Sequence, residues 1–279
     1  MGHCSLSGPP SASHTGHDAG AAEPLPPLAP PPPEAFGGPA HAQDQVYDPQ
    51  AAARSREDMR REHGGMSASR FLIDQVELGI RDGRESYAWD GQFWFGGDID
   101  KLWISTEGEG ELGGGGEHAE VQLLWSRAVD PWFDLQIGVR HDVRPEPGRT
   151  HLVLGVQGLA PYWFELDGAL FLSTEGDITA RFEAEYDLRL TQHLILQPRA
   201  EIDLSLQDVE ELGIGAGLST AELGVRLRYE IRPEAGPAVI APYVGLQYQR
   251  AFGGTGDFRR AGGEDEGGWS LLVGVRTWF

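Results

Sequence analysis

Apolar and polar side chains alternate along segment after segment of this chain from residue 71 to its end. In residues 179–190, TARFEAEYDLRL, the apolar Phe182 lies between the charged Arg181 and Glu183, and the pattern continues on both sides. Successive side chains of a β-strand point to opposite faces, so each such segment has one apolar and one polar face. A soluble sandwich also alternates, but the recurrence of the pattern in nearly every strand is typical of a barrel with lipid outside and a polar interior.

The predicted fold class is all-β: a transmembrane antiparallel up-and-down β-barrel of about 12 strands, preceded by a disordered N-terminal tail. An even number of strands puts both ends of the barrel on the same rim. The turn residues between the alternating segments place the strands at roughly residues 71–81, 87–96, 101–107, 118–128, 132–142, 150–159, 162–173, 178–190, 194–206, 219–231, 239–251 and 269–279.

The connections between these strands are predicted to alternate in length. Stretches such as GEGELGGGGE and GGTGDFRRAGGEDEGG form long links on one rim, whereas Asp130-Pro131 and Ala160-Pro161 mark short turns on the other. The link 232–238 departs mildly from this rule. Outer-membrane barrels have short periplasmic turns and longer extracellular loops, so both barrel ends and the tail are predicted on the periplasmic side. Aromatic residues near the short turns predict an interfacial belt there: Trp132, Phe133, Tyr162, Trp163, Trp278 and Phe279.

Composition divides the chain into three parts. Residues 1–48 are rich in Pro, Gly and Ala and cannot bury enough apolar surface to fold, so a disordered tail is predicted. Residues 49–70 have the composition of a short helical linker, and residues 71–279 form the barrel. A mean hydropathy of -0.35, without a long apolar run, excludes a helical membrane protein. A formal net charge of -21 disfavours nucleic acid as a partner and favours cations.

Four segments carry a family resemblance: WDGQFWFGGDIDKLWISTEGEGE, DPWFDLQIGVRHD, GLAPYWFELDGALFLSTEGDITARFEAEYDLRLTQHLILQPRAE and ELGVRLRYEIR. They resemble the copper resistance protein B family of bacterial outer-membrane proteins, and the resemblance covers about residues 70–279. It implies copper ions as the ligand and the bacterial outer membrane as the location. The N-terminal regions of that family are often rich in Met and His, whereas this chain has 3 Met in total, so Cu(II) is favoured over Cu(I).

Histidine and acidic residues mark two candidate metal sites. At the long-loop rim, His118, His141 and His151 begin or end neighbouring strands, and Glu120 and Asp142 point inward nearby. Imidazole nitrogen with carboxylate oxygen suits Cu(II). His141 has the outward parity of its strand, so it needs a twist or bulge to join this site. A second acidic group is predicted deeper in the lumen: Glu165, Asp167, Glu183, Glu185 and Asp187.

Two interpretations of the inward charges stay open at this point. In the first, carboxylates and arginines form ion-pair networks that fill the interior, as small barrels often require. In the second, surplus carboxylates form a cation path, with histidine supplying nitrogen ligands for copper.

The predicted function is that of an outer-membrane copper resistance protein, which binds copper ions or passes them through an acidic lumen. The alternatives are a plugged barrel that tethers a periplasmic copper-binding or copper-oxidising partner, and a general small porin. The sequence lacks a G-x-S-x-G elbow, a phosphate-binding loop and an H-E-x-x-H motif, so neither an enzyme nor an organic cofactor is expected. The expected partners of this monomeric barrel are outer-membrane lipid, copper ions and a periplasmic copper protein, with no nucleic acid.

Overall fold

The computed structural model describes residue 37 and residues 40–81, 83–113, 115–145, 148–233 and 236–279. The predicted disordered tail falls largely on residues 1–36, 38 and 39, which lie outside the described residues. The chain forms two compact units that meet in the sequence between Asp58 and Met59. Among the described residues, no helix is both long enough and apolar enough to cross a membrane.

Within the described residues before β1 (Ala68–Arg81), the chain forms one α-helix. It is α1 (Pro49–His63), and it follows a short 3-10 turn, η2 (Ala42–Gln45). Asp48 caps the start of α1, because its carboxylate accepts a hydrogen bond of 2.9 Å from the Ala51 N–H. Gly65 follows the end of the helix with a φ of 67°, which glycine adopts without strain.

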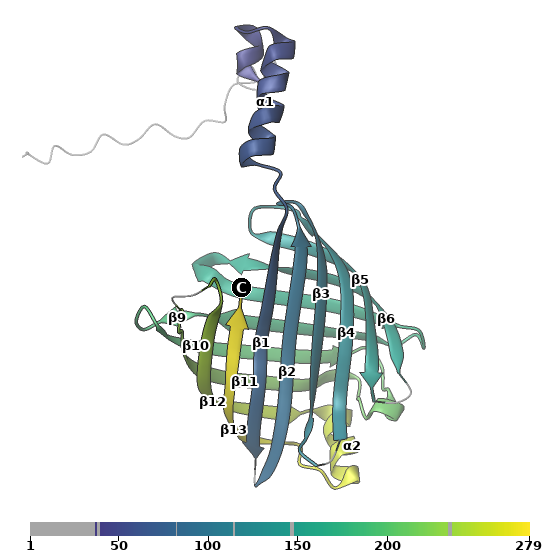
Figure 1. Ribbon diagram of the computed structural model, residues 1–279. Helices are drawn as coiled ribbons and strands as arrows, with labels where there is room; N and C mark the ends of the chain where they lie inside the picture. The colour runs from purple at the N-terminus through teal and green to yellow at the C-terminus, as the bar shows by residue number, and fades with distance from the viewer. Residues whose placement is uncertain (1–36, 38–39, 82, 114, 146–147, 234–235) are drawn as a thin grey trace, which may run out of the picture. The chain divides into compact units, whose positions relative to one another are not determined.

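Twelve antiparallel strands close into a barrel (Figure 1). Each pairs with the next along the chain, and the ring closes because β13 also pairs with β1. The short β9 continues β8 after the single residue Asp187 and pairs with the same neighbour, so the two count as one interrupted strand. The prediction of a twelve-stranded barrel is confirmed. The bounds are β1 (Ala68–Arg81), β2 (Arg84–Gly96), β3 (Asp100–Glu111), β4 (Gly115–Ala128), β5 (Phe133–Arg144), β6 (Arg149–Ala160), β7 (Phe164–Ser173), β8 (Ile178–Tyr186), β9 (Leu188–Arg189), β10 (Leu194–Ser205), β11 (Gly217–Tyr229), β12 (Val239–Ala251) and β13 (Gly267–Trp278).

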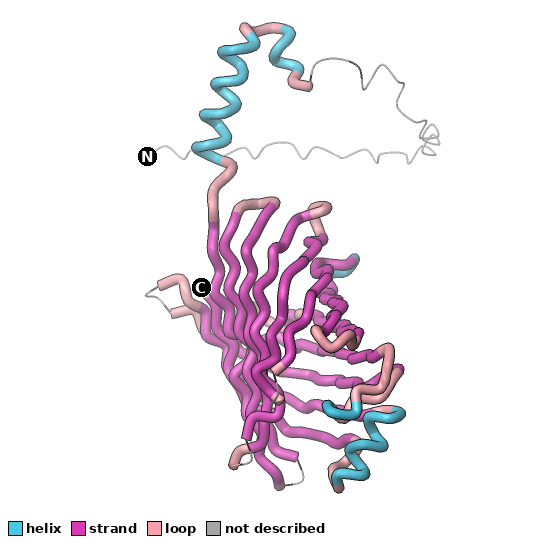
Figure 2. The backbone as a smooth tube through the Cα atoms, turned by 90° about the vertical axis from the view of Figure 1, so that its right-hand side faces the viewer, coloured by secondary structure: helices cyan, strands magenta, loops and turns pink. Residues whose placement is uncertain are grey.

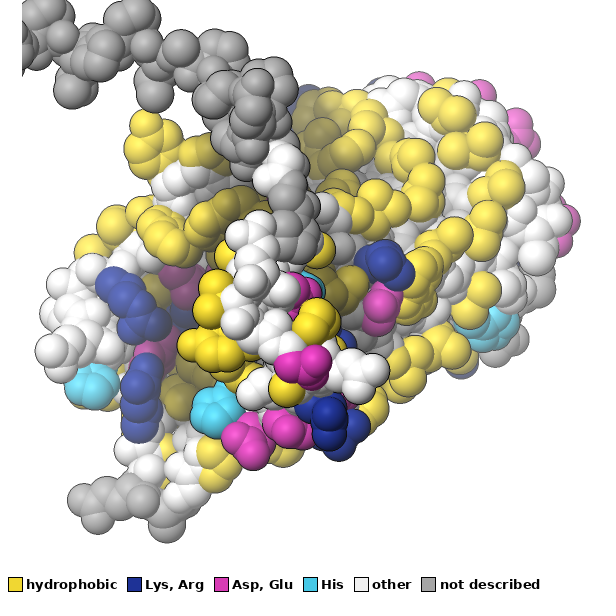
Figure 3. All heavy atoms as spheres, turned by 90° about the horizontal axis from the view of Figure 1, so that it is seen from above, with side chains coloured by type: hydrophobic (Ala, Val, Ile, Leu, Met, Phe, Trp, Pro, Cys, Tyr) yellow, Lys and Arg dark blue, Asp and Glu magenta, His cyan; other side chains and the backbone are white. Residues whose placement is uncertain are grey.

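The barrel has an apolar outside and a polar inside. Large aliphatic side chains such as Val244 and Leu271 expose more than half of their surface on the outer face, whereas Glu120 and Glu230 are each only 1% exposed. Figure 3 shows apolar side chains covering much of the outer wall. A closed ring of hydrogen bonds with an apolar exterior meets the demand of hydrocarbon, which leaves no backbone polar group without a partner. The barrel is therefore a transmembrane one.

Aromatic side chains gather at the rim that carries the C-terminus. Trp132 and Trp163 lie on the surface with their ring centroids 5.9 Å apart, and Phe71 and Phe279 lie 5.3 Å apart. Tyr162 is 84% exposed in the three-residue turn η3 (Pro161–Trp163). These positions are typical of an interfacial belt, where one side of a ring meets lipid and its edge meets water.

The predicted alternation of long and short connections is wrong in part. By the bounds of the described strands, the long links on the far rim are residues 206–216 and 252–266, whereas residues 112–114 separate β3 from β4. Four glycines of GEGELGGGGE pair as strand because the ladder uses backbone groups alone: Gly108, Gly110, Gly115 and Gly116. Gly108 leaves room for the Trp89 side chain, since a Cβ atom there would lie 2.2 Å from the Trp89 ring. On the short-turn rim, residues 230–238 separate β11 from β12, which agrees with the departure predicted for the link 232–238.

A helix that the glycine-rich sequence does not predict lies in the last loop. It is α2 (Gly253–Gly262), drawn near the loop end of the barrel in Figure 2. Glycine is a poor helix former, so packing must stabilise this helix. The backbone of Gly215 lies so close that a Cβ atom there would meet Gly254 Cα at 2.5 Å, and the Gly215 N–H donates to Thr255 Oγ1 at 2.8 Å. The contact with the 206–216 loop therefore holds α2.

A bulge in β1 changes which residues face the lumen. The pairing of β1 with β2 shifts by one residue between Ile73 and Gln75. Because of this shift, consecutive residues Asp74 and Gln75 both line interior cavities, whereas Val76 lies on the outer face. Parity counted back from Glu77 assigns Asp74 to the outside and is wrong there.

The close contact at Gly108 generates a stability prediction. Gly108→Ala is expected to destabilise the barrel by about 1–3 kcal/mol, because the added carbon overlaps the Trp89 ring and the His118 carbonyl oxygen, which would lie 2.8 Å away. The measurement is the temperature at which the folded band of the detergent-solubilised protein converts to the unfolded band in electrophoresis. Gly155→Ala is the matched control, since a Cβ atom there meets nothing nearer than 3.5 Å. Equal conversion temperatures for the two variants would contradict the packing argument.

Candidate functional site

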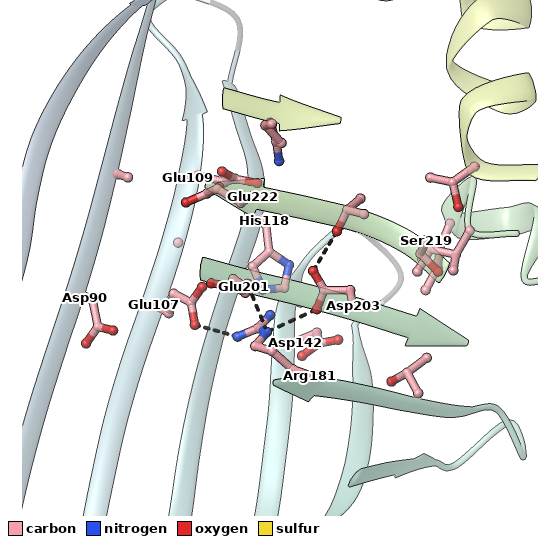
Figure 4. Close-up of a pocket in the computed structure, with 18 of the residues that line it drawn as sticks. Asp90, Glu107, Glu109, His118, Asp142, Arg181, Glu201, Asp203, Ser219 and Glu222 are labelled. Carbon is pink, nitrogen blue, oxygen red and sulfur yellow. Dashed lines mark hydrogen bonds and ion pairs between the residues drawn. The ribbon is translucent and has the colours of Figure 1, made fainter. Parts of the chain in front are cut away.

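The lumen contains two cavities that meet near the middle of the barrel. The loop-side cavity, of about 510 Å³, lies between the loop-side strand ends and α2, and Figure 4 shows part of its lining. The turn-side cavity, of about 560 Å³, reaches the rim that holds Trp278 and Leu159. Four residues line both cavities and so mark the boundary between them: Asp90, Glu107, Phe171 and Arg181.

Acidic side chains outnumber basic ones in each cavity. Among the described residues, nine carboxylates and five guanidinium groups line the turn-side cavity, and the loop-side cavity has the same numbers. A lining with this excess attracts cations and repels anions. The turn-side carboxylates are Asp74, Asp90, Glu107, Glu165, Asp167, Glu183, Glu185, Asp187 and Glu230, and the loop-side ones are Glu77, Asp90, Glu107, Glu109, Asp142, Glu201, Asp203, Glu222 and Glu264.

A row of histidine, carboxylate and arginine crosses the inner face of β4, β5 and β6. The row begins with His118, whose Nε2 lies 2.8 Å from Glu120 Oε2. Arg140 lies between the two carboxylates, 2.8 Å from Glu120 Oε2 and 2.6 Å from Asp142 Oδ1. The row ends with His151, whose Nε2 lies 3.0 Å from Asp142 Oδ2. Adjacent strands thus bring two imidazoles and two carboxylates together, as the sequence predicts for four of the five rim residues.

The electrostatic balance of this mouth row depends on Arg140. Glu120 is 1% exposed, and a carboxylate so deeply buried needs compensating charge or hydrogen bonds. Arg140 supplies both, and its guanidinium also stacks 4.6 Å from the Phe171 ring centroid. The Nδ1 atom of His151 is buried without a hydrogen-bond partner, so the row keeps one nitrogen that no side chain satisfies.

His141 does not join the row. Its side chain lies on the outer face, where its Nδ1 is 2.9 Å from Thr150 Oγ1. No bulge turns it inward, since His141 pairs in register with Thr150 across β5 and β6. The outward parity of the strand persists to its end.

The deeper acidic group lines the turn-side cavity, but its members differ in how they are neutralised. Glu183 Oε2 lies 2.5 Å from Arg199 Nη2, and Asp187 forms an ion pair with Arg228. Glu185 accepts a hydrogen bond of 3.0 Å from Gln197. Within the described part of the chain, Glu165 and Asp167 have no hydrogen bond or ion pair. Ion pairs and surplus carboxylates therefore coexist in one cavity.

Three charged residues that matter inside the barrel were not among those predicted. The bulge in β1 conceals the inward position of Asp74 from a parity count. Asp74 Oδ1 forms an ion pair with Arg276 Nε on β13, at 2.9 Å. The inward parity of β5 and of β2 is a signal that could have identified Arg140 and Asp90. Across the described residues, no group of three or more His, Cys, Asp or Glu side chains is arranged to hold a metal ion.

The comparisons with known proteins agree with this architecture. Residues 67–279 match the family model described as copper resistance protein B precursor. The copper resistance protein B of Escherichia coli is 44% identical over 208 residues, which cover 75% of this chain and 68% of that protein. A copper resistance protein B homolog of Pseudomonas syringae pv. tomato is 41% identical over 217 residues, covering 78% and 72%.

Among solved structures, the NanC porin is similar over 73% of this chain and 98% of the porin chain, with 14% sequence identity and a TM-score of 0.49. The family match and the identities across the whole barrel decide the assignment. The chain belongs to the copper resistance protein B family, and its barrel lies in the bacterial outer membrane.

Proposed function

We propose that this protein binds Cu(II) at the long-loop mouth of its barrel and passes the ion along the acidic lumen. The observation that carries the proposal is the mouth row, in which His118 and His151 each lie within 3.0 Å of an inward carboxylate. Membership of a family named for copper resistance supports copper as the cargo. The role is non-enzymatic, and the protein needs no organic cofactor.

The donor atoms favour Cu(II) over Cu(I). Imidazole nitrogen and carboxylate oxygen suit the divalent ion, whereas Cu(I) prefers the sulfur of Cys and Met. Neither Cys nor Met lines either cavity within the part of the chain that the structure describes. An incoming Cu(II) would compete with Arg140 for Glu120 and Asp142, because the guanidinium already neutralises both. The free Nδ1 of His151 is a further nitrogen that the ion can use.

The acidic group of the turn-side cavity continues the proposed path. Glu165 and Asp167 are the free carboxylates of that group, while Glu183, Glu185 and Asp187 are held by arginine or glutamine side chains. A cation that leaves the mouth row therefore meets carboxylates that attract it without holding it in a closed cage. Weak, repeated binding of this kind permits conduction.

A plugged barrel that tethers a periplasmic copper protein is the second candidate function. The observation that favours it is the layer of ion pairs between the two cavities, where Arg181 contacts carboxylates on several strands. In that case copper binds at the mouth but does not cross. A general porin is less well supported, because the charged side chains divide the lumen into two small cavities.

The mouth row predicts the effect of removing its histidines. The double substitution His118→Ala and His151→Ala is expected to lower the affinity for Cu(II) by at least about tenfold, which corresponds to about 1.4 kcal/mol of binding free energy. The measurement is a calorimetric titration of the detergent-solubilised barrel with Cu(II) at neutral pH. His141→Ala is the matched control, since it removes an imidazole from the same rim on the outer face. Unchanged affinity in the double variant would remove the mouth row from the proposal.

The turn-side carboxylates predict the effect on passage. Glu165→Gln with Asp167→Asn is expected to slow Cu(II) entry into proteoliposomes several-fold, while leaving Cu(II) titration of the mouth unchanged. Loss of two free negative charges weakens the attraction that draws a cation through. The measurement is fluorescence quenching of a copper-sensitive dye trapped in the vesicles, and Glu85→Gln serves as a control because Glu85 is an exposed residue outside both cavities. No entry through the unmodified protein would favour the tether.

A further inference from the structure

Arg181 stands at the boundary between the two cavities and lines both of them. It extends from β8, and its Nη1 lies 2.7 Å from Glu107 Oε2 on β3. The strands β3 and β8 are five apart in a ring of twelve, so they face each other nearly across the diameter. This ion pair therefore spans the lumen, as Figure 4 shows for the contact between Glu107 and Arg181.

The same guanidinium contacts three more carboxylates. Arg181 Nε lies 3.3 Å from Asp203 Oδ1 and 3.5 Å from Glu201 Oε1, both on β10, and Nη2 lies 3.9 Å from Glu120 Oε2 on β4. All three acids are held by further side chains. Thr220 donates to Asp203 at 2.7 Å, and Gln122 donates to Glu120 at 2.6 Å. Arg199 donates to Glu201 at 2.7 Å. One cation thus ties together both walls of the barrel through carboxylates that have little freedom to move.

Three other interior arginines reach fewer strands around the ring: Arg226 on β11 pairs with Glu77 on β1, three strands away, and the other two pair with an adjacent strand. Arg276 on β13 pairs with Asp74 on the adjacent β1, and Arg199 on β10 pairs with Glu183 on the adjacent β8. These contacts neutralise charge within one side of the barrel and leave the central space open. The position of Arg181 differs because its partners come from opposite walls.

We infer that Arg181 is the gate of the lumen: it blocks the passage between the two cavities, and the cavity-lining carboxylates that it neutralises there favour cations once the guanidinium moves aside. A guanidinium between the two cavities occupies the space and repels a passing cation. Without it, Glu107 and Asp203 line that stretch of the passage with no arginine between them, while Glu201 keeps Arg199 as its partner. The inference rests on the proposed function only in taking the lumen as the route of the ion.

The test measures the conductance of single barrels in planar bilayers, in KCl with a metal chelator present. Arg181→Gln is expected to raise the conductance several-fold and to shift the reversal potential in a KCl gradient toward cation selectivity. Glu107→Gln is expected to raise the conductance to a smaller extent, because Arg181 loses its far anchor but keeps Asp203 and Glu201. Arg276→Gln is the matched control, since it removes an equally interior arginine whose partner lies on the adjacent strand.

The conductances of these three variants decide whether Arg181 closes the lumen. Conductance equal to that of the unmodified protein in folded Arg181→Gln and Glu107→Gln barrels would overturn the inference, and so would an equal rise in Arg276→Gln. Heat-modifiable migration shows which variants are folded, and if Arg181→Gln does not fold, the comparison of Glu107→Gln with Arg276→Gln decides. The assay contains no copper, so a failure of Cu(II) to bind the mouth row counts against the proposed function alone.

Discussion

The structure depends on one constraint: within hydrocarbon, every backbone N–H and C=O must find a partner in the chain itself. The pairing of β13 with β1 satisfies this constraint by removing the last two sheet edges. Once the ring closes, the alternation of strand side chains follows, with aliphatic residues toward lipid and the rest toward a shared interior. The unusual burial pattern, with Glu120 and Glu230 more hidden than most leucines, is a direct result.

The interior then has to accommodate many charges in little space. A buried carboxylate is costly without a partner, and the described arginines supply most of the partners from neighbouring strands. Because carboxylates outnumber arginines in both cavities, the charge of the carboxylates is not fully neutralised. Among the described residues, Glu165 and Asp167 are carboxylates that stay without a partner. The interior thus combines a framework of ion pairs, which holds the walls together, with a residual negative potential that suits a metal cation. Stability and cation preference come from the same set of side chains.

The sequence predicts the strands and their faces well because both are local properties. A period of two, read over ten residues, fixes the orientation of Glu183 or Arg181 without knowledge of any other strand. What it could not predict depends on contacts between distant segments. The helix α2 forms because Gly215 lets it approach, the bulge at Asp74 appears only in the pairing with β2, and the Arg181–Glu107 contact joins strands far apart in the chain. For the candidate site, parity located His118 and His151. The role of Arg140 depends on its position between two carboxylates, which only the pairing of the strands shows.

The bulge in β1 also bears on how this strand tolerates insertion and deletion. Before it, even-numbered residues such as Arg70 and Leu72 face inward, and after it odd-numbered residues such as Glu77 do. Loss of one residue within a regular stretch of β1 would exchange the lipid and lumen faces of everything up to the next irregularity. Loss of Asp74 itself would leave both halves in phase and remove only the partner of Arg276. Length variation among relatives is therefore expected to concentrate at the bulge.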